Sequence, residues 1–197
     1  SNIMSIKDLG DKSISAGKRG SGTELAFSRL LGMYGLSYDS IRNNGGTVHF
    51  VGYGETKQLF KDRHIQMGIF DHRPPDPAIV EAETAFPVRV LDLGQKMVED
   101  YLKKYPGHLM ATIPKGTYKG QEEDVTTLAW APMMTVNKDL PDELVYNITK
   151  AIYENPERLA KGFKTLGVLS PEMAVEGIPI PFHPGAAKYF KEKGVLK

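Results

Sequence analysis

The chain has 197 residues, of which 41% are hydrophobic, and its formal net charge is +1 at pH 7, which predicts an ordinary globular protein of one large domain or two small ones. The balanced charge, without a block of basic residues, argues against nucleic acid or an anionic membrane surface as a partner, and no apolar run approaches the ~20 residues that span a bilayer. Cysteine is absent, which excludes disulfides, thiol catalysis and Cys-based zinc sites.

Alternating polar and apolar residues at 12–16 predict a first buried strand, and apolar residues at helical spacing from Leu25 to Tyr34 predict a helix that ends near Gly35. Residues 38–46 are rich in turn formers and predict a loop. The other expected elements are strands at 47–51, 65–70, 87–93 and 125–136, helices at 54–62, 78–85, 96–105, 141–155 and 186–193, a partly helical stretch at 156–169, a loop at 111–121 and an extended segment at 178–185. Strand, helix and strand in this order predict a parallel α/β unit.

The turn Gly17–Glu24 stands where the first strand passes to the first helix. Gly20 and Gly22 allow the backbone to approach a ligand, while Ser21 and Thr23 can cap the helix, with their hydroxyls and the free backbone N–H groups facing outward. Because such N–H groups and the helix dipole favour negative charge, this helix start suits a carboxylate, a phosphate or another anion. The alternative is a well-capped strand-to-helix turn that binds nothing.

The turn does not match any of three more specific binding or catalytic motifs. A P-loop requires Lys followed by Ser or Thr, and Thr23 and Glu24 stand there instead. A nucleophile elbow around Ser21 requires glycine where Arg19 stands, and a dinucleotide fingerprint requires glycine where Leu25 stands. An anion-binding helix start is the ligand-binding interpretation that remains.

The loop at 71–77 follows the strand expected at 65–70. Ligands of open α/β sheets bind beyond the carboxyl ends of the strands, so this loop is a second candidate wall of a site. Arg73 could hold a carboxylate through two N–H groups, and Asp71 or His72 could meet an amine or a hydroxyl. The alternative for each side chain is a solvated turn.

The five histidines stand at 49, 64, 72, 108 and 183, and no two have the one-turn spacing that places a pair of metal ligands on one side of a helix. We therefore expect neither a metal nor a cofactor. Nothing in the sequence assembles a nucleophile, a base and an orienting group, so we expect no enzymatic activity. The competing hypotheses are a hydrolase or transferase with Ser21 as nucleophile and His72 as base, and a truncated relic that binds no solute.

Four segments, at 16–24, 113–125, 140–146 and 181–189, resemble in order and spacing the TAXI family of TRAP-transporter solute receptors. The resemblance implies a type II periplasmic binding-protein fold, in which two α/β lobes close on a small anionic solute. It also implies a periplasmic or otherwise extracytoplasmic location. Family members deliver glutamate, glutamine or related organic acids to a membrane TRAP permease.

Family precursors begin with a signal peptide and an N-terminal lobe, and we expect this chain to begin near the crossover into the second lobe. Residues 6–125 are then expected to form one mostly complete α/β ligand-binding lobe, and residues 126–197 the crossing strand and C-terminal helices that normally pack on the other lobe. Apolar surface left uncovered in this way predicts a homodimer or an exchanged dimer. The expected ligand-binding residues are Gly20, Ser21, Gly22, Thr23, Asp71, His72, Arg73 and Tyr118.

Overall fold

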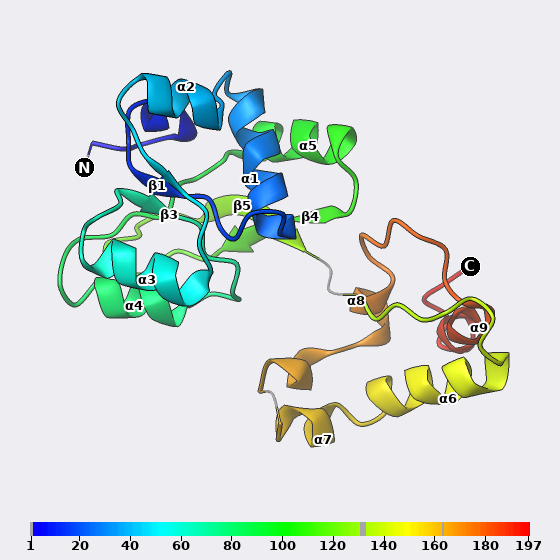
Figure 1. The fold of residues 1–197 in the computed structure, drawn as a ribbon. Coiled ribbons are helices and arrows are strands. Elements are labelled where there is room, and N and C mark those ends of the chain that lie inside the picture. The colour runs from blue at the N-terminus through cyan, green and yellow to red at the C-terminus, as the bar shows by residue number, and fades with distance from the viewer. Residues whose placement is uncertain (1, 131–132, 163) are drawn as a thin grey trace. The chain divides into compact units, whose positions relative to one another are not determined.

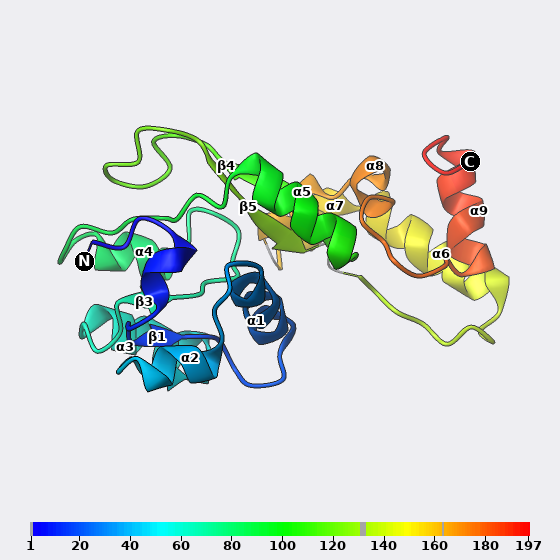
Figure 2. The ribbon, with the colours of Figure 1, turned by 90° about the horizontal axis from the view of Figure 1, so that it is seen from above.

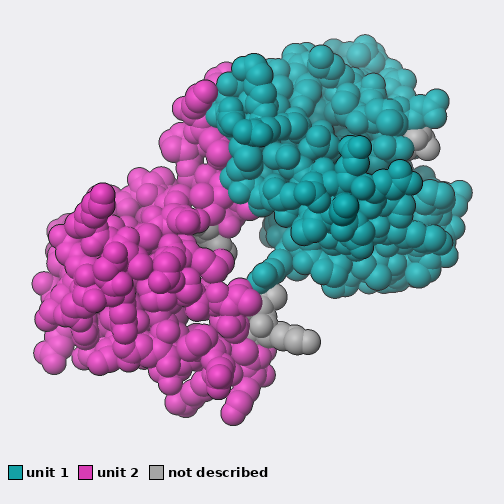
Figure 3. All heavy atoms as spheres, turned by 180° about the vertical axis from the view of Figure 1, so that it is seen from behind, with its two compact units in different colours: residues 1–101, 110–127 teal, residues 102–109, 128–197 magenta. Residues whose placement is uncertain are grey.

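The structure is a computed structural model that describes residues 2–130, 133–162 and 164–197. Two compact units divide the chain: residues 1–101 with 110–127, and residues 102–109 with 128–197 (Figure 3). In chain order the elements of Figure 1 are η1 (Ile6–Leu9), β1 (Ile14–Ser15), α1 (Gly22–Met33), α2 (Tyr38–Asn43), β2 (Val48–His49), α3 (Tyr53–Lys61), β3 (Met67–Gly68), α4 (Pro77–Ala82), α5 (Gln95–Lys104), β4 (His108–Ile113), β5 (Val125–Trp130), α6 (Asp142–Tyr153), α7 (Pro156–Ala160), η2 (Lys164–Val168), α8 (Pro171–Ala174) and α9 (Pro184–Glu192).

The first unit contains a three-stranded parallel sheet in the order β2-β1-β3, with Ile14 of β1 opposite Val48 on one side and Met67 on the other. This confirms the predicted parallel α/β unit. The three strands are only two residues long, so the lengths expected at 12–16, 47–51 and 65–70 were wrong. Apolar alternation reports which side chains are buried, and it does not fix how far neighbouring backbones stay paired.

The loop expected at 38–46 was also wrong, because residues 38–43 form helix α2. Ser37 caps this helix by accepting a hydrogen bond from the Ser40 N–H, and the Ser40 hydroxyl accepts one from the Ser37 N–H. Ile41, a residue of this helix, is fully buried. The serine pair forms a capping box, whose stabilisation of one short helix outweighs the turn-forming residues that follow it.

Strands β4 and β5 form a separate two-stranded sheet. β4 begins at His108, in a stretch where no strand was expected, and β5 ends at Trp130, whereas the sequence predicted a strand to 136. Residues 131 and 132 of the expected strand lie outside the described residues. Residues 87–93, where a strand was expected, form no strand in the described chain. Two hydrogen bonds nevertheless join the end of this segment to β5: the Leu93 N–H donates to the Thr126 carbonyl, and the Asp92 side chain accepts from the Thr126 N–H.

Helices cover the parallel sheet and bury the core of the first unit. Leu9, Ile14, Leu31 and Ile41 are fully buried there, and α3 contacts both β3 and α4, with which it lies side by side (Figure 1). The fold places the segments that follow β1, β2 and β3 at one edge of the sheet, because parallel strands end on the same side.

The second unit is built on α6 and α9, which lie side by side in Figures 1 and 2. Their contact is close because Gly185 of α9 faces the Asp142 carbonyl at the start of α6, where even a Cβ atom would stand 2.2 Å from the oxygen. Tyr189 and Phe190 are buried along this contact, and Tyr153 packs edge-on against the Phe190 ring at 5.5 Å. The helix predicted at 141–155 thus packs against the terminal helix.

Candidate functional site

The turn between β1 and α1 adopts a conformation that requires glycine, since Gly17 and Gly20 have φ angles of 84° and 78°. Ser21 is the N-cap residue of α1, and its Oγ accepts the Glu24 N–H at 3.2 Å. The Gly20 N–H donates to Glu24 Oε2, also at 3.2 Å. One carboxylate of the chain, that of Glu24, therefore already lies at the helix start and accepts one of the backbone N–H groups there.

The backbone N–H groups of Gly22 and Thr23 belong to the first turn of α1, where no intrahelical acceptor exists. Within the described ranges they donate to no protein group. The Thr23 hydroxyl has a partner outside the helix, because it donates to Asp71 Oδ2 at 2.7 Å. This hydrogen bond joins two segments that the sequence analysis singled out separately, the turn after β1 and the loop after β3.

His72 lies beside two carboxylates. Its Nδ1 stands 3.7 Å from Asp71 Oδ1 and 3.5 Å from Asp76 Oδ2. The imidazole ring packs at 4.1 Å, centroid to centroid, against Tyr53, the first residue of α3 and close to the end of β2. Segments after all three strands of the parallel sheet thus meet around His72.

Asp76 contacts several members of this cluster, and its side chain is only 2% exposed. Its Oδ1 caps α4 by accepting the Ala78 N–H at 2.7 Å and also accepts the Tyr53 hydroxyl at 2.7 Å. Its backbone N–H donates to the Tyr118 hydroxyl at 2.8 Å. Its other carboxylate oxygen, Oδ2, is buried and has no hydrogen-bond partner among the described residues.

The two tyrosines of this network hold their protons tightly. Burial, and then the hydrogen bond to the Asp76 carboxylate, raise the pKa of Tyr53 to about 12. Burial likewise raises the pKa of Tyr118. At neutral pH both hydroxyls are therefore neutral, and Tyr53 acts as a fixed donor to Asp76.

Sequence reasoning missed Asp76 and Tyr53. The signal for Asp76 was present, because an Asp before a Pro at the first helical position is a typical helix N-cap. The Tyr53 contact had no sequence signal, since it depends on β2 and β3 flanking β1. Arg19 was also passed over: its guanidinium stacks 3.8 Å from the centre of the Phe50 ring.

The expected site residues fall into three groups. Thr23, Asp71 and His72 are brought together, and Tyr118 joins them through the Asp76 backbone. Gly20, Ser21 and Gly22 form the adjoining helix start. Arg73 is exposed beside His72, and among the described residues it has no ion-pair partner. No hydrogen bond within the described chain joins Ser21 to His72, which removes support for a nucleophile and base pair.

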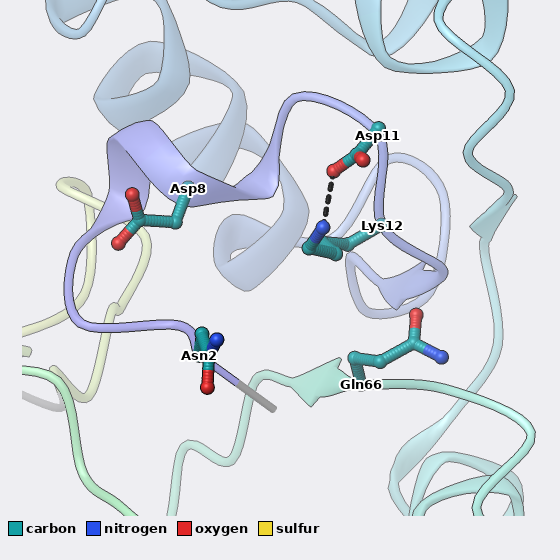
Figure 4. A pocket seen from close by; sticks show the side chains of 5 residues that line it. All are labelled: Asn2, Asp8, Asp11, Lys12 and Gln66. Carbon is teal, nitrogen blue, oxygen red and sulfur yellow. Dashed lines mark hydrogen bonds and ion pairs between the residues drawn. The ribbon is translucent and has the colours of Figure 1, made fainter.

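A hollow lies near the N-terminus and is lined by Asn2, Asp8, Asp11, Lys12 and Gln66 (Figure 4). Its polar groups are mostly occupied: Asp11 pairs with Lys12, Asp8 accepts two backbone N–H groups, and Gln66 accepts the Ser13 N–H. Among the described residues no group of three or more His, Asp or Glu side chains could hold a metal ion. No helix of the described chain is long and apolar enough to cross a membrane.

A parallel sheet with helices, and a polar cluster beyond the carboxyl ends of its strands, are consistent with the class of periplasmic-binding-protein-like α/β proteins. Residues 1–194 match the model of the NMT1-like family, so the chain belongs to that family. The family lies in the periplasmic-binding-protein-like group, is typically extracytoplasmic, and supports a solute-binding role in transport. The resemblance to TAXI receptors is a finer assignment and stays a prediction.

Proposed function

We propose that the chain is the extracytoplasmic solute-binding component of a TRAP-type secondary transporter. It captures a small organic acid of the class of glutamate or glutamine and presents it to a membrane permease. Binding takes place without turnover, and the homodimer or exchanged dimer suggested by the sequence remains a separate prediction. Family membership supports the solute-binding role, and the TAXI resemblance supports the transporter type and the solute.

The observation that supports a site at the start of α1 is the 2.7 Å hydrogen bond from the Thr23 hydroxyl to Asp71 Oδ2. It holds the loop after β3 against the start of α1, beside the Gly22 and Thr23 N–H groups, for which the described residues provide no acceptor. A carboxylate of the solute placed on these N–H groups also lies at the positive end of the helix dipole. Arg73 is a cation on the same loop that has no ion-pair partner among the described residues, although the carboxylates of Glu24 and Asp71 restrict how much negative charge the site can accept.

Isothermal titration of the 197-residue chain with L-glutamate, L-glutamine, succinate and glutarate tests the proposal. Thr23→Ala removes the hydroxyl that fixes Asp71, and one charge-assisted hydrogen bond of about 1.5 kcal/mol corresponds to about a tenfold loss of affinity. Thr84→Ala is the matched control, because the Thr84 hydroxyl donates only to the nearby Glu81 carbonyl.

The proposal predicts that Thr84→Ala binds as the unaltered chain does and that Thr23→Ala binds about tenfold more weakly. Absence of binding heat for all four compounds contradicts it. Equal affinities of Thr23→Ala and the unaltered chain contradict the placement of the site at the start of α1.

A further inference from the structure

A further hollow, of about 390 Å³, lies in the first unit where the residues that follow α4 meet the loop between β4 and β5. This volume is within the range of ~300–1,000 Å³ that is typical of sites for small molecules. One side of the hollow is apolar, with Phe86, Pro87 and Val88, and the loop contributes Lys119 and Gly120. None of the described residues that line it belongs to the turn after β1 or to the loop after β3, so the hollow is separate from the site at the start of α1.

Hydrogen bonds to both ends of α4 hold the loop side of the hollow. The Tyr118 hydroxyl accepts the N–H of Asp76, the N-cap residue of this helix, at 2.8 Å. The N–H of Lys119 donates to Oε1 of Glu83, the C-cap residue, also at 2.8 Å. Tyr118 is itself buried. This side of the hollow is therefore fixed before a ligand arrives, so binding requires little ordering of the chain.

The aromatic side of the hollow is also held in place. The Phe86 ring packs edge-on against Phe60 of α3, with ring centroids 5.6 Å apart, and the Arg63 guanidinium stacks 4.8 Å from its centre. Arg63 follows the C-cap of α3 with a φ angle of 60°, a left-handed conformation for which glycine is preferred at a helix end. Such a conformation is strained for arginine, and the contact of its guanidinium with the Phe86 ring offsets part of that strain.

The charges around the hollow favour an anion. The Lys119 ammonium has neither a hydrogen bond nor an ion-pair partner among the described residues, and Arg63 has no carboxylate partner among them. Glu83 is the one carboxylate among the described lining residues, and its Oε1 is occupied by the Lys119 N–H. An unpaired ammonium beside an apolar surface matches a ligand that has an apolar body and one acid group.

From this geometry we infer that the hollow is a second binding site, which takes a small carboxylic acid with an aromatic body. The ring lies on Phe86 and Val88, and the carboxylate pairs with the Lys119 ammonium. Phe60 and Arg63 are positioning residues, because they hold the Phe86 ring. The inference goes beyond the proposed function, since neither the location of this site nor its selection for an apolar body belongs to the site at the start of α1.

The test is isothermal titration of the 197-residue chain at pH 7 with three probes. Phenylacetate has the ring and the acid, phenethyl alcohol has the ring without the acid, and acetate has the acid without the ring. We expect phenylacetate to bind about fivefold more tightly than phenethyl alcohol, as one solvent-exposed ion pair provides, and acetate to give no binding heat.

Two lysine variants assign the charge that the carboxylate contacts. Lys119→Met keeps a long side chain and removes the ammonium, so it should bind phenylacetate and phenethyl alcohol equally. Lys115→Met is the matched control, because Lys115 lies on the same loop but does not line the hollow, and it should keep the preference for phenylacetate. Equal binding of the two aromatic probes by the unaltered chain, or an unchanged preference in Lys119→Met, overturns the role of Lys119.

Amide chemical shifts measured by NMR locate the ligand. Phenylacetate should shift the amides of Phe86 and Gly120, which line the hollow, and leave those of Gly22 and Thr23 in place. Absence of binding heat for phenylacetate overturns the inference and leaves the proposed function, which is tested with glutamate, standing. Shifts confined to Gly22 and Thr23 overturn the second site and place the acid at the start of α1.

Discussion

Asp76 combines a helix cap, a tyrosine partner and a buried charge in one side chain, and two substitutions separate these contributions. Asp76→Ala removes the acceptor of the Ala78 N–H and of the Tyr53 hydroxyl, both at 2.7 Å. Asp76→Asn keeps an oxygen that can accept both hydrogen bonds and removes only the charge. The comparison therefore measures the acceptor separately from the ionised group.

The loss expected for Asp76→Ala follows from the contacts. Removal of an N-cap costs about 1 kcal/mol, and removal of a buried acceptor that leaves the Tyr53 hydroxyl unpaired costs about 1–3 kcal/mol, so the free energy of unfolding should fall by about 2–4 kcal/mol. Asp76→Asn should change it by less than about 1 kcal/mol, because the lost charge is offset by a smaller desolvation cost.

The measurement is urea denaturation followed by far-ultraviolet circular dichroism, with the fluorescence of Trp130 recorded in parallel. Trp130 is the only tryptophan of the chain and belongs to the second unit, so its signal reports that unit while Asp76 lies in the first. The unit-1 transition should move to lower urea in Asp76→Ala. Equal losses in Asp76→Ala and Asp76→Asn would show that the charge, and not the acceptor, stabilises the cluster, and would refute this reasoning.

Two further predictions concern close packing and alkaline pH. Gly185→Ala places a Cβ atom 2.2 Å from the Asp142 carbonyl oxygen and should destabilise the second unit by about 1–3 kcal/mol. Gly32→Ala, with open space around its Cβ in α1, should instead stabilise the chain by about 0.5–1 kcal/mol. Thermal unfolding measures both effects, and an unchanged transition in Gly185→Ala contradicts the packing argument. The pKa of Tyr53 is raised from 10.0 to about 12 by burial and by Asp76, so the folded state binds this proton more tightly than the unfolded state. The resulting contribution to the free energy of unfolding is fully present below pH 10 and is lost as the pH rises through about 12. The fall in stability between pH 9 and pH 11 should therefore be smaller in Tyr53→Phe than in the unaltered chain. Equal falls in the two proteins count against the raised pKa of Tyr53.

Local signals in the sequence determined much of the secondary structure. The helix after the glycine-rich turn, the helix begun by Pro141 and the terminal helix were confirmed, because apolar spacing and capping residues act within a few residues of chain. The parallel α/β unit was confirmed because the order strand, helix, strand along the chain predicts parallel pairing. The helix at 38–43 was missed because a serine capping box outweighed nearby turn formers, and strand lengths were overestimated because pairing depends on a neighbour.

The sequence by itself determined the chemical types available at the site: a helix start with small residues after β1, and a charged loop after β3. Only the tertiary structure decided that Thr23 holds Asp71, that Tyr53 and Tyr118 both bind Asp76, and that one His72 nitrogen faces two carboxylate oxygens. These contacts join residues up to 48 positions apart. They arise because three parallel strands end at the same edge of one sheet, a relation between backbones that no local pattern of residues contains.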